Sequence, residues 1–168
     1  MTDKILVAYA TKAGSTAEVA EAIGQELRDA GAEVEVSQAK DVKDVTLYKA
    51  VIIGSAIRMG KWVSEATEFV EENRQALSQV PVAYFVVCMT MKDDTEENRS
   101  TVEAYLDPMS ELVEPVDIGL FAGAMNYEKL SFGARTLAKA MKVREDDWRD
   151  WEVIRAWARQ VHDRLMAE

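Results

Sequence analysis

The chain has 168 residues, of which 48% are hydrophobic, and its 20 basic and 30 acidic side chains give a formal net charge of −10. This length and apolar content exclude a disordered chain and predict one domain over residues 1–168, while the negative charge excludes nucleic acid and anionic membrane surfaces as ligands. One cysteine, no signal-peptide pattern and no apolar run long enough to span a bilayer predict a cytoplasmic protein without disulfides or a transmembrane segment.

The first half of the chain alternates apolar runs with amphipathic segments. The uncharged run at residues 5–10 is typical of a strand buried on both faces, and a stripe of apolar residues over 17–30 predicts a helix that ends at Gly31. Val34 and Val36 stand between polar neighbours and indicate an edge strand. A further apolar run at 50–56 predicts another buried strand.

The second half repeats the alternation. A helix over 64–78 precedes a strand over 82–89, and a helix over 95–113, which Pro108 is expected to kink or break, precedes a strand over 116–123. A short helix after Ser131, with Phe132, Leu137 and Met141 facing inward, and a longer helix after Asp150 complete the prediction. Strand followed by helix, five times over, predicts an α/β fold with a parallel sheet covered on both faces.

The loop TKAGST, residues 11–16, lies at the carboxyl end of the first strand, where open parallel sheets bind ligands. It contains neither the GxGxxG dinucleotide pattern nor a Walker loop. The hydroxyls of Thr11, Ser15 and Thr16, the small Gly14 and the following helix N-terminus together suit a terminal phosphate dianion, with Lys12 directed to solvent. The alternative is a helix N-cap, for which a single hydroxyl suffices.

Several motifs resemble those of known flavodoxin-like proteins. Seven residues stand at the spacing of the flavodoxin signature, whose loop wraps the phosphate of FMN, although Ala8 departs from it: Val7, Tyr9, Thr11, Gly14, Thr16, Ala20 and Ile23. The segments GSAIRMGKW, AGAMNY and DWRDWEVIRAWARQV resemble the menaquinone-dependent protoporphyrinogen oxidase branch of these families. The resemblance implies a flavodoxin-like three-layer sandwich with a five-stranded parallel sheet of order 2-1-3-4-5.

The resemblance also implies FMN as cofactor and assigns its contacts to four loops. Arg58 is the predicted catalytic residue, because a cation near the flavin would stabilise its anionic reduced form, and Trp62 is expected to stack on or border the ring. The alternatives are a surface ion pair for Arg58 and a packing role beside the next helix for Trp62. The predicted cofactor-binding residues are Thr11, Lys12, Ala13, Gly14, Ser15, Thr16, Ser55, Ala56, Ile57, Arg58, Gly60, Trp62, Met89, Thr90, Met91 and Gly123. We predict no metal site.

Three functions remain open. The first is an FMN oxidoreductase that takes electrons from a tetrapyrrole and passes them to a quinone, and the lack of an aromatic residue in the stretch CMTMKDDTEENR, residues 88–99, would leave one flavin face open for a substrate. The segment at 142–147, KVREDD, is short and acidic where members of the branch that work at membranes carry a longer, often basic insertion. This departure favours the second function, a soluble electron carrier with a basic protein partner. The third is a binding module that has lost the flavin.

Overall fold

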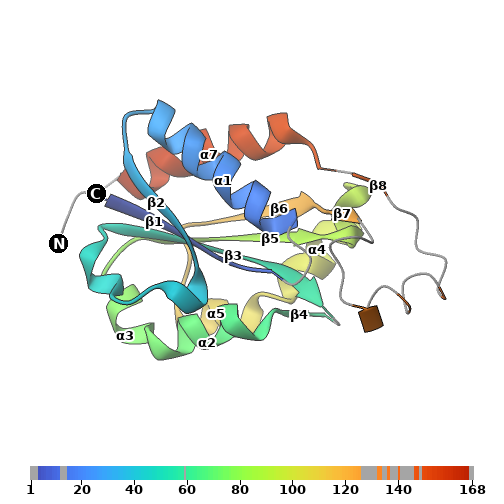
Figure 1. Cartoon of the computed structure of the whole chain (residues 1–168), viewed down its shortest axis with the longest axis horizontal. Helices are drawn as coiled ribbons and strands as arrows, with labels where there is room; N and C mark the ends of the chain where they lie inside the picture. The colour runs from blue at the N-terminus through green and yellow to red at the C-terminus, as the bar shows by residue number, and fades with distance from the viewer. Residues whose placement is uncertain are drawn as a thin grey trace.

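The computed structural model describes residues 4–11, 15–58, 60–125, 132–133, 136, 140, 146–147 and 149–166. Five parallel strands form a central sheet in the order β2-β1-β3-β5-β6 (Figure 1). Their bounds are β1 Lys4–Ala10, β2 Glu33–Gln38, β3 Ala50–Arg58, β5 Val82–Cys88 and β6 Asp117–Ala122. Because these strands are the first to fifth parallel strands along the chain, the predicted order 2-1-3-4-5 is confirmed for them.

Helices cover both faces of the sheet, which confirms the predicted three-layer sandwich (Figure 1). One face packs against α1 (Ser15–Asp29) and α7 (Trp151–Met166), and Figure 1 shows these two helices side by side above the sheet. The opposite face packs against α2 (Ser64–Glu72), α3 (Arg74–Leu77), α4 (Glu96–Ala104) and α5 (Asp107–Leu112). Each face therefore has its own hydrophobic core, and the sheet separates the two.

The burial of the strands follows their sequence patterns. All seven residues of β5 are buried, as expected of the most apolar run, whereas β2 alternates half-buried Val34 and Val36 with exposed Glu33 and Glu35. The place of β2 at one end of the strand order confirms it as an edge strand, and its half-buried valines pack against the core on the α1 face of the sheet. None of the described helices is long and apolar enough to cross a lipid bilayer.

Two predicted helices are each divided in the structure. The helix predicted over 64–78 breaks at Asn73, whose backbone and side-chain nitrogens both donate hydrogen bonds to the carbonyl oxygen of Phe69, at 3.1 and 2.9 Å. An asparagine side chain competes in this way with the helical hydrogen-bond pattern. The helix predicted over 95–113 ends at Ala104 and restarts with Pro108 in the first turn of α5, so the break expected at this proline is confirmed.

Some short elements escaped the sequence prediction. They are the antiparallel strand β4 (Lys61–Trp62) on β3, the two-stranded ribbon of β7 (Ala124–Met125) and β8 (Asp146–Asp147), and the 3-10 turns η1 (Ala39–Asp41), η2 (Val45–Leu47) and η3 (Met89–Lys92). Segments of two to four residues are too short to show a hydrophobic period. The ribbon matters for the site because it brings Asp146 and Asp147 back beside the chain that follows β6.

The inward placement of Phe132 was wrong, because 84% of this residue is exposed. Helical spacing identifies residues that share one face, but it does not say which face meets the core. The other two residues expected on that face, Leu137 and Met141, lie outside the described residues.

Candidate functional site

The predicted site residues converge on one edge of the sheet, because β1, β3, β5 and β6 are parallel and end there. β1 ends at Ala10, β3 at Arg58, β5 at Cys88 and β6 at Ala122, with Gly123 next in the chain. Each predicted cofactor loop follows one of these ends, so the structure brings the four loops to a common edge. Lys12, Ala13 and Gly14 lie outside the described residues.

The corner between β1 and α1 contains a buried hydroxyl group without a partner. Thr16, in the first turn of α1, is 0% exposed, and its Oγ1 has no hydrogen-bond partner among the residues that the structure describes. A hydroxyl that caps a helix accepts a hydrogen bond from a backbone N–H group of the first turn, which this oxygen does not do. Leaving such a group unpaired costs about 1–3 kcal/mol, so the arrangement favours a polar ligand at this corner over a simple N-cap.

The Ser55 hydroxyl stabilises a hairpin that the sequence did not predict. Ser55 is fully buried; its Oγ donates a hydrogen bond to the carbonyl oxygen of Ala56 at 2.7 Å and accepts one from the backbone nitrogen of Val63 at 2.9 Å. These two bonds join the end of β3 to the chain after β4. Both hydrogen bonds of the Ser55 side chain are therefore made within the hairpin. A contact between this segment and a ligand would have to come from the neighbouring backbone groups.

Trp62 belongs to the β4 strand of this hairpin, and its side chain lies in the hydrophobic core. The residue is 5% exposed, and its ring packs edge to face against Tyr84 with the ring centroids 5.2 Å apart. This placement corresponds to the packing alternative considered for Trp62, because a ligand could stack on the ring only if the side chain left its position. Its Nε1 is buried without a hydrogen-bond partner.

The remaining residues of this loop form the tip of the hairpin. Ala56 and Ile57 are half-buried, and the backbone of Arg58 pairs with Lys61 across the hairpin. Gly60 has a φ of 75°, a left-handed conformation that a residue with a side chain resists, as expected for this glycine. The role of the Arg58 guanidinium stays a prediction.

The loop after β5 is a 3-10 turn held by α4. Met89 is half-buried, Thr90 is exposed and Met91 is 5% exposed. The side-chain amide of Asn98 donates hydrogen bonds to the carbonyl oxygens of Thr90 and Asp93, at 3.2 and 2.8 Å. Asn98 was not predicted to support the site, since an amide group on a helix has no distinctive spacing.

Arg149 is the main residue that the sequence prediction missed. Its side chain is 9% exposed and its Nη1 lies 2.7 Å from Oε2 of Glu18, although 131 residues separate the two in sequence. Its Nη2 lies 2.7 Å from Oδ2 of Asp147, and its guanidinium carbon lies 4.7 Å from the ring centroid of Trp151. Hydrogen bonds to Asp147 and then to Glu18 raise the pKa of Arg149, so it is charged in the folded protein.

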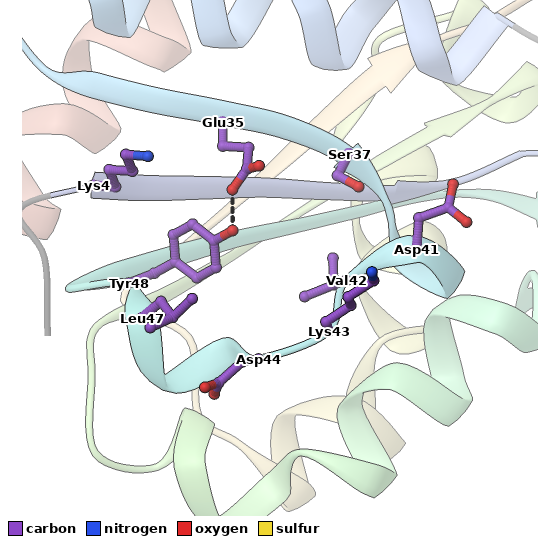
Figure 2. A pocket seen from close by; sticks show the side chains of 9 residues that line it. All are labelled: Lys4, Glu35, Ser37, Asp41, Val42, Lys43, Asp44, Leu47 and Tyr48. Carbon is purple, nitrogen blue, oxygen red and sulfur yellow. Dashed lines mark hydrogen bonds between the residues drawn. The ribbon is translucent and has the colours of Figure 1, made fainter.

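A cavity of about 400 Å³ lies beside the edge strand β2, apart from the predicted site (Figure 2). Figure 2 shows the Tyr48 hydroxyl donating a hydrogen bond to the Glu35 carboxylate across it. Burial first, and then this bond, raise the pKa of Tyr48 to about 12. None of the predicted site residues is among those that line the cavity: Lys4, Glu35, Ser37, Asp41, Val42, Lys43, Asp44, Leu47 and Tyr48.

Because burial and the hydrogen bond to Glu35 raise the pKa of Tyr48, we expect the folded protein to lose stability at high pH. The pKa of Tyr48 is about 12 in the folded protein and about 10 in an unfolded chain, so the stabilisation is complete below pH 10 and is lost as the pH rises towards 12. We expect wild type to exceed Tyr48→Phe in free energy of unfolding by roughly 1.5–3 kcal/mol at about pH 8. Urea denaturation of both proteins from about pH 8 to 11.5 should show this gap narrowing; a constant gap would contradict the assignment.

Five parallel strands in the order β2-β1-β3-β5-β6 between two helical layers define the flavodoxin-like class of α/β proteins. A family model described as a flavodoxin domain matches residues 6–150, and the chain belongs to this family.

Relatives support both the family and the branch that the motifs indicated. The chain is 27% identical over 172 residues to protoporphyrinogen IX dehydrogenase [quinone] of Escherichia coli strain K12, with 94% of each chain covered. Among solved structures, it resembles a flavodoxin from the Archaea at 17% identity and a TM-score of 0.60, covering 98% of this chain and 99% of the other. It also resembles a Fusobacterium nucleatum flavodoxin mutant bound to flavin mononucleotide, at 11% identity and a TM-score of 0.59, covering 98% of each chain.

Proposed function

We propose that the chain binds FMN with its phosphate at the N-terminus of α1 and works as an FMN-dependent oxidoreductase of the protoporphyrinogen dehydrogenase type. The observation that carries this proposal is the fully buried Oγ1 of Thr16, for which the described part of the chain provides no hydrogen-bond partner. A phosphate oxygen accepts hydrogen bonds, and a Thr hydroxyl can donate one. The residues at the corner therefore fit the group.

The start of α1 provides further stabilisation for a phosphate. The first backbone N–H groups of a helix have no partner within the helix, and the helix dipole favours negative charge there. α1 has 15 residues and begins with Ser15 and Thr16, so hydroxyl and amide donors lie in the same turn. Thr11, the first residue after β1, is half-buried. In this proposal the loop 11–16 holds the phosphate.

The loops after β3 and β5 would hold the flavin ring, chiefly through their backbone groups. Gly60 has the positive φ of a tight turn, and the η3 turn presents Met89 and Thr90 at the same edge. FMN supplies the electron-transfer chemistry, and the protein supplies binding, orientation and electrostatics. Because η3 carries no aromatic residue, one face of the ring would remain open to a tetrapyrrole or a quinone. This feature, together with the E. coli relative, favours an enzyme.

Arg58 is the residue we propose to act on the reduced flavin. It is the last residue of β3, at the edge where the ring loops meet, and a cation there would stabilise negative charge on the ring. We expect Arg58→Gln to lower the two-electron reduction potential by about 30 mV, which corresponds to about 1.4 kcal/mol. The matched control is Lys61→Gln, which removes an exposed charge from the same hairpin. Spectroelectrochemical titration giving equal potentials for wild type and Arg58→Gln would contradict the assignment.

An anaerobic absorbance titration tests the reaction. The FMN-loaded protein is mixed with protoporphyrinogen in one cell and with a reduced basic redox protein in another, and flavin absorbance is followed. The proposal predicts bleaching by protoporphyrinogen and recovery on addition of a water-soluble quinone. Bleaching by the basic protein alone would establish the alternative, an electron carrier whose partner is attracted by the net charge of −10.

A further inference from the structure

We infer that Arg149 compensates the acidic first turn of α1 and thereby makes this turn able to hold a phosphate dianion. The inference rests on the proposed function and adds to it a positioning residue outside the predicted loops. The supporting observation is that the Arg149 guanidinium contacts both Glu18 of α1 and Asp147 of β8.

Arg149 contacts the first turn of α1 directly. Besides its ion pair with Glu18, its Nη1 lies 3.5 Å from the carbonyl oxygen of Ser15, the first residue of the helix. Its Nε and Nη2 hold the two carboxylate oxygens of Asp147 at 2.9 and 2.7 Å. The side chain of Arg149 is 9% exposed, whereas those of Glu18 and Asp147 are 45% and 48% exposed, so solvent screens the carboxylates more than the guanidinium. The guanidinium is therefore fixed at the same helix end as Thr16.

Glu18 and Asp147 place negative charge beside the proposed phosphate site, and Arg149 forms ion pairs with both. A carboxylate in the first turn of a helix is favourable by itself, but it repels a phosphate bound to the same helix end. With Arg149 present, the three charged groups sum to −1; without it, the two carboxylates leave −2 beside the phosphate. We expect this added unit of negative charge to weaken the binding of a dianion by about tenfold.

A purely structural role for Arg149 predicts a different pattern. If Arg149 only fastened the segment before α7 to α1, its loss would lower stability and would weaken FMN and riboflavin to the same extent. Charge compensation acts on the phosphate alone, and riboflavin lacks the phosphate. The ratio of the two affinities therefore separates the two roles.

The test is fluorescence titration of the full-length apoprotein with FMN and with riboflavin. We expect Arg149→Gln to weaken FMN about tenfold relative to riboflavin. The matched control Arg155→Gln, which removes an exposed partner of Glu152 on α7, should leave the ratio unchanged. The double variant Glu18→Gln/Arg149→Gln should recover most of the FMN affinity, because it removes one of the two carboxylates that Arg149 contacts in the wild type.

Glu18→Gln alone keeps the test decisive if Arg149→Gln does not fold, since Glu18 is 45% exposed and Arg149 retains Asp147. It should bind FMN more tightly relative to riboflavin. An unchanged ratio in Glu18→Gln, or in a folded Arg149→Gln, overturns the inference while leaving FMN binding intact. Failure of wild type to bind FMN overturns the proposed function, and the inference with it.

Discussion

Replacing Thr16 with Asp is expected to lower the affinity for FMN more than about 100-fold. The new carboxylate would occupy the place of a fully buried hydroxyl at the start of α1, where we propose the phosphate binds. Two like charges about 4 Å apart repel by about 4 kcal/mol in a partly buried site, and the phosphate carries nearly two. Riboflavin has no phosphate, so its affinity should change far less. Fluorescence titration with both flavins measures the difference.

Thr16→Val is the uncharged counterpart of this variant. It removes the unpartnered Oγ1 at almost constant shape, so the apoprotein should gain about 1 kcal/mol in free energy of unfolding while its FMN affinity falls. A gain in stability together with a loss of affinity would identify the hydroxyl as a binding group. Should Thr16→Val lose stability and keep its FMN affinity, the hydroxyl would have a structural role only.

Gly54→Ala is expected to lower the free energy of unfolding by about 3 kcal/mol or more. Gly54 on β3 lies opposite Phe85 on β5, and a Cβ atom at this glycine would overlap the aromatic ring. The ring of Phe85 is fully buried and packs against Phe121 and Trp157, with centroids 6.3 Å away in both cases. It therefore has little room to retreat. Urea denaturation measures the loss.

Two controls connect this loss to the overlap. Gly133→Ala should leave stability almost unchanged, because no atom lies within 4 Å of the Cβ it would add. Adding Phe85→Leu to Gly54→Ala should cost less than the sum of the two single changes, since the smaller side chain makes room for the new methyl group. Strict additivity would show that the glycine is needed for another reason.

Most of the fold could be predicted because its strands have strong local signals. The apolar runs that became β1, β3 and β5 are buried in the structure, and the alternation at Val34 and Val36 correctly indicated an edge strand. The corner where we propose that the phosphate binds could be located from the sequence, since Thr16 and its neighbours are contiguous in sequence and stand at the start of an amphipathic helix. A local sequence pattern is enough to locate a candidate site when its residues lie within one turn of the chain.

The missed features depend on contacts between distant segments. Arg149 approaches Glu18 across 131 residues, and no periodicity relates the two. Ser55 and Trp62 were expected at the ligand because their segment resembles a flavin loop, but the hairpin of β3 and β4 buries both. A two-residue strand leaves no hydrophobic period by which to anticipate that burial.

The central claim is that α1 holds the FMN phosphate as a dianion, and ³¹P NMR of the FMN-loaded protein tests it most directly. Free phosphate monoesters titrate with a pKa near 6. We predict a bound resonance shifted from that of free FMN and constant from about pH 5.5 to 8, because the helix N-terminus and the hydroxyls favour the dianion. A bound resonance that titrates like free FMN would contradict the claim, because the phosphate would then lie in solvent.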